Sequence, residues 1–160
     1  MKIDLQKEHE WLQQLIGEWT YVSECVMEPG QPPEKFEGSE SVRSLGGLWL
    51  LCEGCGEMPG GGTATMLMTL GYDTRQQRFV GTWIGSMMTH LWIYDGALDA
   101  NGTVLTLNTE GPCCTSEGKL AKQRDVITIQ SPQQRLLTSY LLDDEGQWQL
   151  FMTAQYRRRT

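Results

Sequence analysis

The segment 81–95, GTWIGSMMTHLWIYD, concentrates the side chains of this chain that could do chemistry. It contains His90, one of only 2 histidines among 160 residues, and surrounds it with Trp83, Trp92 and Tyr94. An imidazole among aromatic rings can serve as a general base, as a metal or haem ligand, or as a hydrogen-bonding group for a bound molecule. It can equally be a core histidine whose nitrogens bond to neighbours. No serine or cysteine nucleophile has a motif that points to it.

The two halves of this segment are predicted to form a β-hairpin, because two apolar runs flank a turn at residues 85–88. An even loop places Trp83 opposite His90 and Gly81 opposite Trp92. A small residue beside a large one favours this register. One face of the hairpin then carries aromatic rings and the other is aliphatic. An odd loop would exchange the faces of one strand. The sequence therefore leaves open which face points into the barrel, and the aromatic face could instead lie outside and form an interface.

Neither face of this hairpin is polar, although a wall in contact with water should carry polar side chains. We therefore expect the outer face to be covered by the N-terminal helix, by a second copy of the chain, or by both. A homodimer is one way to bury such a face.

Two glutamates come into register if Gly46 and Gly47 form a two-residue turn. That turn pairs Val42 with Leu51 and places Glu40 opposite Glu53. Facing carboxylates repel, and a buried pair would share a proton, which indicates an acid–base pair or a cation site. A slipped register, or solvent on that face, would remove the interaction.

Charged residues also begin a predicted strand at Arg124 and Asp125, just before Val126 and Ile127. One of the two side chains should point inward if the strand is regular. An inward arginine could bind the carboxylate of a ligand or pair with Glu53. Both side chains could also lie at a wet rim.

Methionines give a candidate apolar lining. Met66 and Met68 share one face of a predicted strand, and Met152 lies on the last one. Flexible thioether side chains suit an adaptable binding surface, although ordinary core packing is equally consistent. The glycine-rich loop at 58–63 runs into a strand and not into a helix, so it is interpreted as a flexible portal and not as a phosphate cradle.

The 5 cysteines form a poor disulfide framework and suit a reducing compartment. Cys52 and Cys55 have metal-like spacing, but they lie along a predicted strand and point to opposite faces. The adjacent Cys113 and Cys114 would also splay apart. No metal site is predicted, and whether either pair has a redox role stays open.

The elements that must position these residues are one helix and a series of short strands. Residues 7–16 show an apolar stripe at helical spacing, which Gly17 ends. Short apolar or alternating runs follow, each bounded by turn residues, which is typical of an antiparallel meander. With about ten strands, closure into an up-and-down β-barrel removes the exposed edges. We expect one domain over 1–160, with the helix in 1–17 across one mouth and the barrel in 18–157. The predicted strands are 19–27, 36–45, 48–56, 63–71, 79–85, 89–98, 104–110, 119–129, 136–142 and 148–156.

Composition narrows the classes of function. The net charge of −7 argues against a nucleic-acid binder, which would show a basic face. The N-terminus has no apolar signal-peptide core, and no window reaches the length of a membrane-spanning helix. A cytoplasmic protein without a membrane partner is expected.

Several motifs occur in order over nearly the whole chain: EHEWL at 8–12, GEW at 17–19, SVRSLGGLW at 41–49, LGYD at 70–73, GTW at 81–83 and MTAQYRR at 152–158. Together they resemble one bacterial family, known as the domain of unknown function 1579. That family is similar to the calycin group, which includes lipocalins, fatty-acid-binding proteins and nitrobindin-like haem barrels. The resemblance implies a closed antiparallel barrel with a central cavity. Nitrobindin-like barrels hold haem through a histidine late in the chain, and the last predicted strand here has none, so no cofactor is predicted.

Three functions are consistent with these residues. The first is a module that binds a small apolar or amphipathic ligand inside the barrel. The second is an enzyme that uses His90 with a carboxylate as acid and base. The third is an interaction protein with a filled core. For the first function, the predicted binding residues are Trp83, His90, Trp92, Tyr94, Met66, Met68 and Met152, with Glu53 and Arg124 as polar anchors.

Overall fold

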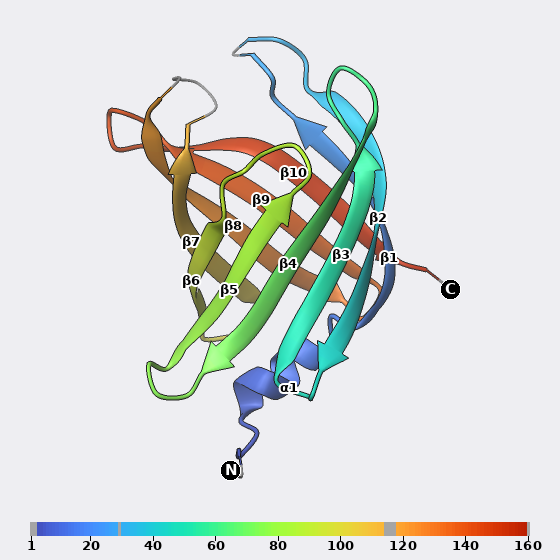
Figure 1. The fold of residues 1–160 in the computed structure, drawn as a ribbon, viewed down its shortest axis with the longest axis vertical. Coiled ribbons are helices and arrows are strands. Elements are labelled where there is room, and N and C mark those ends of the chain that lie inside the picture. Colours follow the sequence, from blue (N-terminus) through green and yellow to red (C-terminus); the bar gives the residue numbers. More distant parts are fainter. Residues whose placement is uncertain (1–2, 29, 114–117, 160) are drawn as a thin grey trace.

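The computed structural model describes residues 3–28, 30–113 and 118–159, and in it ten antiparallel strands close into one barrel (Figure 1). Each strand pairs with its neighbours in sequence, and β1 pairs with β10 to complete the ring. The predicted up-and-down barrel with an N-terminal helix is confirmed. The elements are α1 (Lys7–Gln13), β1 (Gly17–Cys25), β2 (Glu34–Leu45), β3 (Trp49–Glu57), β4 (Thr63–Asp73), β5 (Arg78–Gly85), β6 (Trp92–Leu98), β7 (Val104–Pro112), β8 (Leu120–Ser131), β9 (Gln134–Leu142) and β10 (Trp148–Arg158).

The helix α1 is shorter than the predicted 7–16. Its last turn tightens, because Leu15 N donates to Leu12 O and Ile16 N donates to Gln13 O. Such bonds satisfy the carbonyls at a helix end. Gly17 then takes a φ of +138°, which only glycine adopts readily, and β1 begins there.

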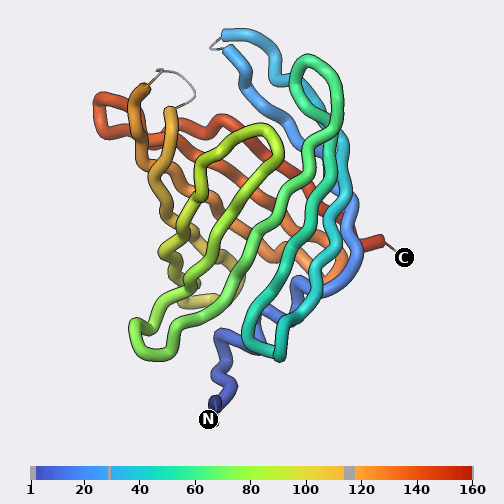
Figure 2. The backbone as a smooth tube through the Cα atoms, viewed as in Figure 1, coloured from blue at the N-terminus to red at the C-terminus, as the bar shows by residue number. Residues whose placement is uncertain are grey.

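This helix closes one end of the barrel, as the sequence predicts (Figure 2). Leu12 is fully buried, and Leu15 is 2% exposed. The indole nitrogen of Trp11 donates to the carbonyl of Gly102 at 2.7 Å. The second histidine, His9, accepts a hydrogen bond from Gln6 N through Nδ1 and contacts Tyr72 O through Nε2 at 3.2 Å. Its role is therefore to hold the helix against the barrel.

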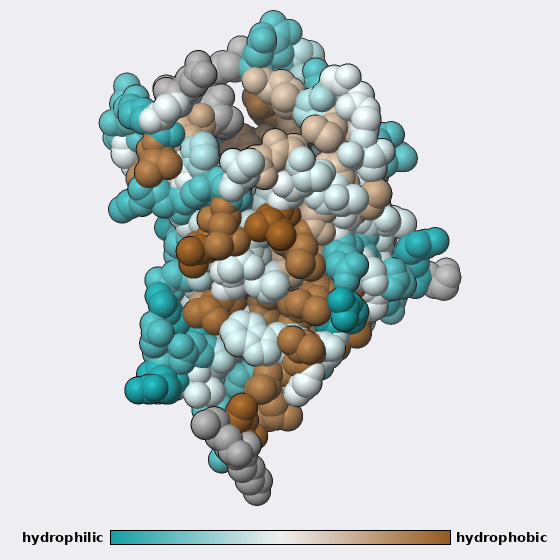
Figure 3. All heavy atoms as spheres, in the orientation of Figure 1, coloured by the Kyte–Doolittle hydropathy of each residue, from teal (hydrophilic) through white to brown (hydrophobic). Residues whose placement is uncertain are grey.

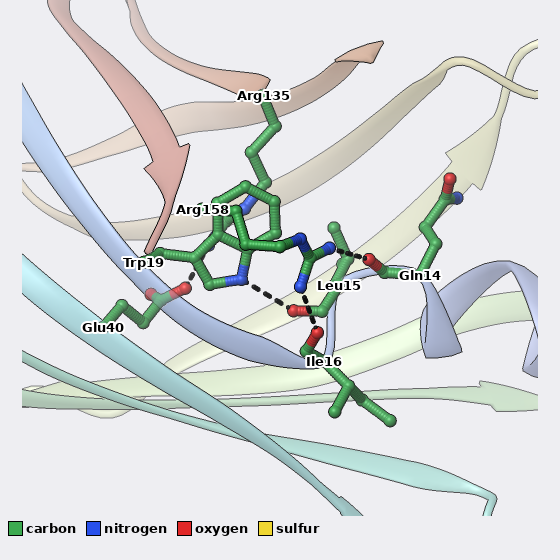
Figure 4. A network of polar contacts seen from close by, with 7 residues as sticks. All are labelled: Gln14, Leu15, Ile16, Trp19, Glu40, Arg135 and Arg158. Carbon is green, nitrogen blue, oxygen red and sulfur yellow. Dashed lines mark hydrogen bonds and ion pairs between the residues drawn. The ribbon is translucent and has the colours of Figure 1, made fainter. Parts of the chain in front are cut away.

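Arg158 fastens the junction between the helix and β1 (Figure 4). Its guanidinium donates to the carbonyls of Ile16 at 2.5 Å and Gln14 at 2.9 Å. The same group stacks on Trp19, at 4.2 Å from the ring centroid, and the Trp19 indole donates to Leu15 O at 2.9 Å. Because the carbonyls at the helix end are satisfied in this way, the closed end is a fixed floor.

The hairpin of β5 and β6 has a register two residues away from the predicted one. Trp83 lies opposite Trp92, and Gly81 lies opposite Tyr94. The reason is the connection between the strands: Ser86 turns back onto β4, where its N–H and hydroxyl bond to the backbone of Thr65 at 2.9 and 3.0 Å. A shift of two residues preserves the alternation of side chains, so the predicted aromatic and aliphatic faces are both present.

The aromatic face of this hairpin points into the barrel. Trp92 is 7% exposed and Tyr94 is 3% exposed, whereas Ile93 between them is 65% exposed. The expectation that the helix covers the aliphatic outer face is wrong, because α1 packs at the barrel end against β3 and β4. Figure 3 shows apolar side chains over this outer wall. The exposed apolar residues there include Ile84, Leu91 and Ile93.

Candidate functional site: the barrel interior

A cavity of about 370 Å³ occupies the barrel between the helical floor and the opposite end. Figure 3 shows the surface hollowed at that opposite end, between the loops that join the strands. Most of the lining is apolar, with aromatic rings and thioethers on several strands. Six of the predicted binding residues line the cavity: Met66, Met68, Trp83, Trp92, Tyr94 and Met152.

Strand pairing explains why these side chains meet. Met68 pairs with Trp83 across β4 and β5, and Trp83 pairs with Trp92 across β5 and β6. Residues in register on antiparallel strands put their side chains on the same face of the sheet. Tyr94, two residues beyond Trp92, points to the same side. The result is a continuous sulfur and aromatic wall from β4 to β6.

A buried carboxyl group, Asp125, interrupts this apolar surface. The Tyr94 hydroxyl donates to Oδ2 of Asp125 at 2.5 Å, and the Ser139 hydroxyl donates to Oδ1 at 2.6 Å. Burial raises the pKa of Asp125 above its ordinary value, although the two hydrogen bonds act to lower it. Burial, followed by the nearby Asp125 charge, raises the pKa of Tyr94. This cluster can accept hydrogen bonds from a molecule in the cavity.

A buried ion pair forms the second polar cluster. Arg135 is 4% exposed and binds Glu40 through Nη2. Its guanidinium lies 3.9 Å from the Tyr156 ring centroid and 4.7 Å from that of Trp19. Its Nε has no hydrogen-bond partner among the described residues. Burial, and then the Glu40 charge, raises the pKa of Tyr156 well above its ordinary value. The two charges neutralise each other, and the Nε–H of Arg135 remains available as a hydrogen-bond donor.

The two predicted polar anchors lie outside the cavity. Glu53 binds Arg43 at 3.0 Å on the outer wall, where both side chains are exposed. Arg124 donates from Nε to Asn108 Oδ1 at 2.9 Å and stacks on Trp148. The prediction that they point inward is wrong.

The β2–β3 hairpin shows why Glu53 was misplaced. Leu45 pairs with Trp49, so three residues form the turn, and Val42 lies opposite Cys52 instead of Leu51. A shift of one residue moves every side chain of one strand to the other face. Glu40 therefore faces inward opposite Gly54, and the predicted Glu40–Glu53 pair does not form.

The expectation that one member of the Arg124–Asp125 pair points inward is confirmed, with Asp125 in the inner position. Strand alternation predicted that one of the two points inward, but it could not tell which one. No comparable signal marks Arg135 or Glu40, because their positions depend on the register of the strands. Sequence reasoning missed Arg135 and considered Glu40 only as a partner of Glu53.

His90 lies beside the cavity and is absent from its lining. It precedes β6, and its Nε2 donates to the carbonyl of Glu110 at 3.2 Å. Its ring packs edge-on against Trp92, with 4.7 Å between centroids. The structure therefore places His90 beside the ring of Trp92, where it supports the wall.

The cysteines form no metal site in the described part of the chain. No group of three or more histidine, cysteine, aspartate or glutamate side chains there could hold an ion. Cys52 is buried and Cys55 is exposed, on opposite faces as predicted. Burial raises the pKa of the Cys52 thiol, which makes it a poor nucleophile. Cys114 lies outside the described residues.

The glycine-rich loop between β3 and β4 lies at the open end of the barrel (Figure 1). Met58 and Pro59 of this loop line the cavity, together with Met87 and Met88 of the β5–β6 loop. Met88 accepts a hydrogen bond through its sulfur from the Trp92 indole at 3.0 Å. These loops surround the route by which a molecule would reach the interior.

Comparison with solved structures finds the same fold in proteins of low identity. Rv2717c from M. tuberculosis has a TM-score of 0.68 and 14% identity, over 98% of this chain and 100% of that chain. The S-type phycobiliprotein lyase CPES from Guillardia theta has a TM-score of 0.57 and 12% identity, over 99% of each chain. EF1p2_mFAP2b bound to DFHBI has a TM-score of 0.52 and 12% identity, over 95% of this chain and 99% of that chain.

No curated protein sequence matches this chain. A family model described as "Protein of unknown function (DUF1579)" matches residues 4–158, which is nearly all of the chain and agrees with the resemblance seen in its motifs. The chain therefore belongs to the DUF1579 family of barrel proteins, whose function is unknown.

Proposed function

We propose that this protein binds a small, partly apolar molecule inside its barrel. The observation that carries the proposal is the interior cavity of about 370 Å³, with its apolar wall and few polar groups. Ligand sites in proteins are typically concave, mostly apolar and about 300–1,000 Å³ in volume. A cavity of this size argues against the alternative of a filled core.

The arrangement of the two barrel ends supports this proposal. Leu12 of α1 and Leu15, which follows the helix, fill the closed end, and the methionine-bearing loops surround the open end. Methionine side chains adapt to molecules of different shape. Among proteins of the same fold, EF1p2_mFAP2b is bound to DFHBI, so a barrel of this kind can hold a small molecule. Fold likeness alone assigns no ligand to this chain.

Catalysis by His90 with a carboxylate has less support. His90 bonds to the backbone carbonyl of Glu110, and it does not line the cavity. No helix in the described part of the chain is long and apolar enough to cross a membrane. Homodimerisation and a cytoplasmic location remain predictions from the sequence.

Titration with N-phenyl-1-naphthylamine, a neutral dye that fluoresces in apolar surroundings, tests the proposal. Binding should increase the dye emission and quench the fluorescence of Trp83 and Trp92. Gly54→Leu should abolish both signals, because a Cβ at Gly54 lies 3.5 Å from the Met66 methyl group and a longer side chain enters the cavity. Cys55→Leu, on the adjacent outward position, is the matched control and should bind normally.

Thermal unfolding of both variants verifies that they fold. If the wild type fails to bind the dye, or if Gly54→Leu binds as well as Cys55→Leu, the interior is not the binding site.

A further inference from the structure

We propose that the cavity selects an amine, namely an apolar body with a protonated amino group that pairs with Asp125. This inference rests on the proposed ligand-binding function and specifies the chemical class of the ligand. It starts from a carboxyl group that is buried in a mostly apolar lining, where burial of a charge is costly.

Asp125 has no cationic partner among the described residues. Its two contacts are hydroxyl groups, Tyr94 at 2.5 Å and Ser139 at 2.6 Å. Each oxygen of a carboxylate can accept two hydrogen bonds, so each oxygen of Asp125 retains one free acceptor position. Burial opposes ionisation of this group and raises its pKa. An ammonium group in the cavity would supply the missing charge and occupy the free positions.

The remaining charges of the lining favour the same class of ligand. Among the described lining residues, the charged side chains are three carboxyls, Glu40, Glu57 and Asp125, and one guanidinium, Arg135. Arg135 is already bound to Glu40, so its charge is not available to a second anion. The net charge of the whole chain, −7, also attracts cations and repels anions.

Aromatic rings beside the carboxyl favour a cation further. The ring of Tyr94 is tied to Asp125 by its own hydroxyl, and the rings of Trp83 and Trp92 line the same cavity. An ammonium group near the face of such rings gains favourable electrostatic energy, most strongly where water is excluded.

The free Nε of Arg135 points to a competing possibility, a carboxylate ligand at the other cluster. A carboxylate at that position would approach Glu40, which is bound to the same guanidinium. Like charges at short distance in a buried site are strongly unfavourable. A neutral acceptor on the ligand suits this donor better than an anion does.

Displacement of bound N-phenyl-1-naphthylamine by three molecules with the same eight-carbon chain distinguishes these ligands. The three are 1-octylamine, 1-octanol and octanoate, measured at neutral pH. We expect octylamine to displace the dye at a concentration at least about tenfold lower than octanol, which corresponds to about 1.4 kcal/mol. Octanoate should be the weakest of the three.

Asp125→Asn should bring octylamine to within about twofold of octanol and leave octanol unchanged, because the amide retains the size of the carboxyl but not its charge. Glu53→Gln removes the same charge from the outer wall and should preserve the preference for octylamine. If Asp125→Asn does not fold, the ranking of the three compounds on the wild type decides the question by itself.

A wild type that prefers octanoate, or an Asp125→Asn variant that keeps the preference for octylamine, overturns the amine proposal but leaves the ligand-binding function standing. Failure of the dye and of all three compounds to bind overturns both.

Discussion

Removal of the charge of Glu40 should destabilise the protein far more than removal of the charge of Glu53. Both carboxylates bind an arginine, but the surroundings differ. The side chains of Arg135 and Glu40 are 5% and 14% exposed, whereas those of Arg43 and Glu53 are 62% and 55% exposed. Glu40→Gln leaves the buried Arg135 without an anion, and its Nε already has no partner among the described residues.

The expected loss for Glu40→Gln follows from the behaviour of other buried ion pairs. Breaking such a pair by removing one partner costs about 3–5 kcal/mol. Exposed pairs contribute about 0–1 kcal/mol, so Glu53→Gln should cost less than about 1 kcal/mol. For a domain of this size, 1 kcal/mol lowers Tm by about 2–4 °C, so Glu40→Gln should lower Tm by at least about 6 °C.

Urea unfolding followed by tryptophan fluorescence measures the free energy of unfolding of both variants. The double variant Glu40→Leu with Arg135→Met replaces the pair by apolar groups and should recover most of the loss. Equal destabilisation by Glu40→Gln and Glu53→Gln would refute the reasoning, as would a double variant less stable than Glu40→Gln alone.

Three further predictions concern single side chains. Because burial raises the pKa of Asp125, the folded protein holds that proton more tightly than the unfolded chain, so stability should fall as pH rises from 3.8 through the raised value. Asp125→Asn should flatten this fall when urea unfolding is measured at a series of pH values above 3.8, and an unchanged slope would contradict the assignment. His90→Ala should change the dissociation constant of the dye by less than about threefold, because His90 stands outside the lining; a complete loss of binding would show that it contacts the ligand. A homodimer that forms through the outer wall would bury Ile93, which is 65% exposed in the single chain. Ile93→Lys should then give monomers in light scattering. A wild type that is itself monomeric would contradict the homodimer prediction.

Much of the fold was predictable because it depends on local signals. Short alternating runs separated by glycine and proline turns predicted about ten strands, and the described residues form ten. Grouping of the aromatic residues of β5 and β6 on one face was predicted even though the register was displaced by two residues. Even displacements preserve faces, which explains why the prediction tolerated that error.

The polar groups of the site were less predictable, because an error of one residue in strand register moves a side chain from the inner to the outer face. A two-residue turn at Gly46 and Gly47 would have placed Glu53 on the face of Glu40, and the observed three-residue turn places it outside. Arg124 and Asp125 occupy adjacent positions, and only their neighbours across the barrel decide which is inside. Asp125 meets the hydroxyls of Tyr94 and Ser139 there.

The sequence by itself determined the number of strands, their order and the helix at one end, since apolar periodicity and turn residues act over a few positions. Only the tertiary structure decided which face of the central hairpin is interior, and that Glu40, Asp125 and Arg135 share the cavity. These residues lie on β2, β8 and β9, and they meet because β1 pairs with β10 and closes the sheet. The register of a closed barrel is set by all its strands together, so no local pattern could specify it.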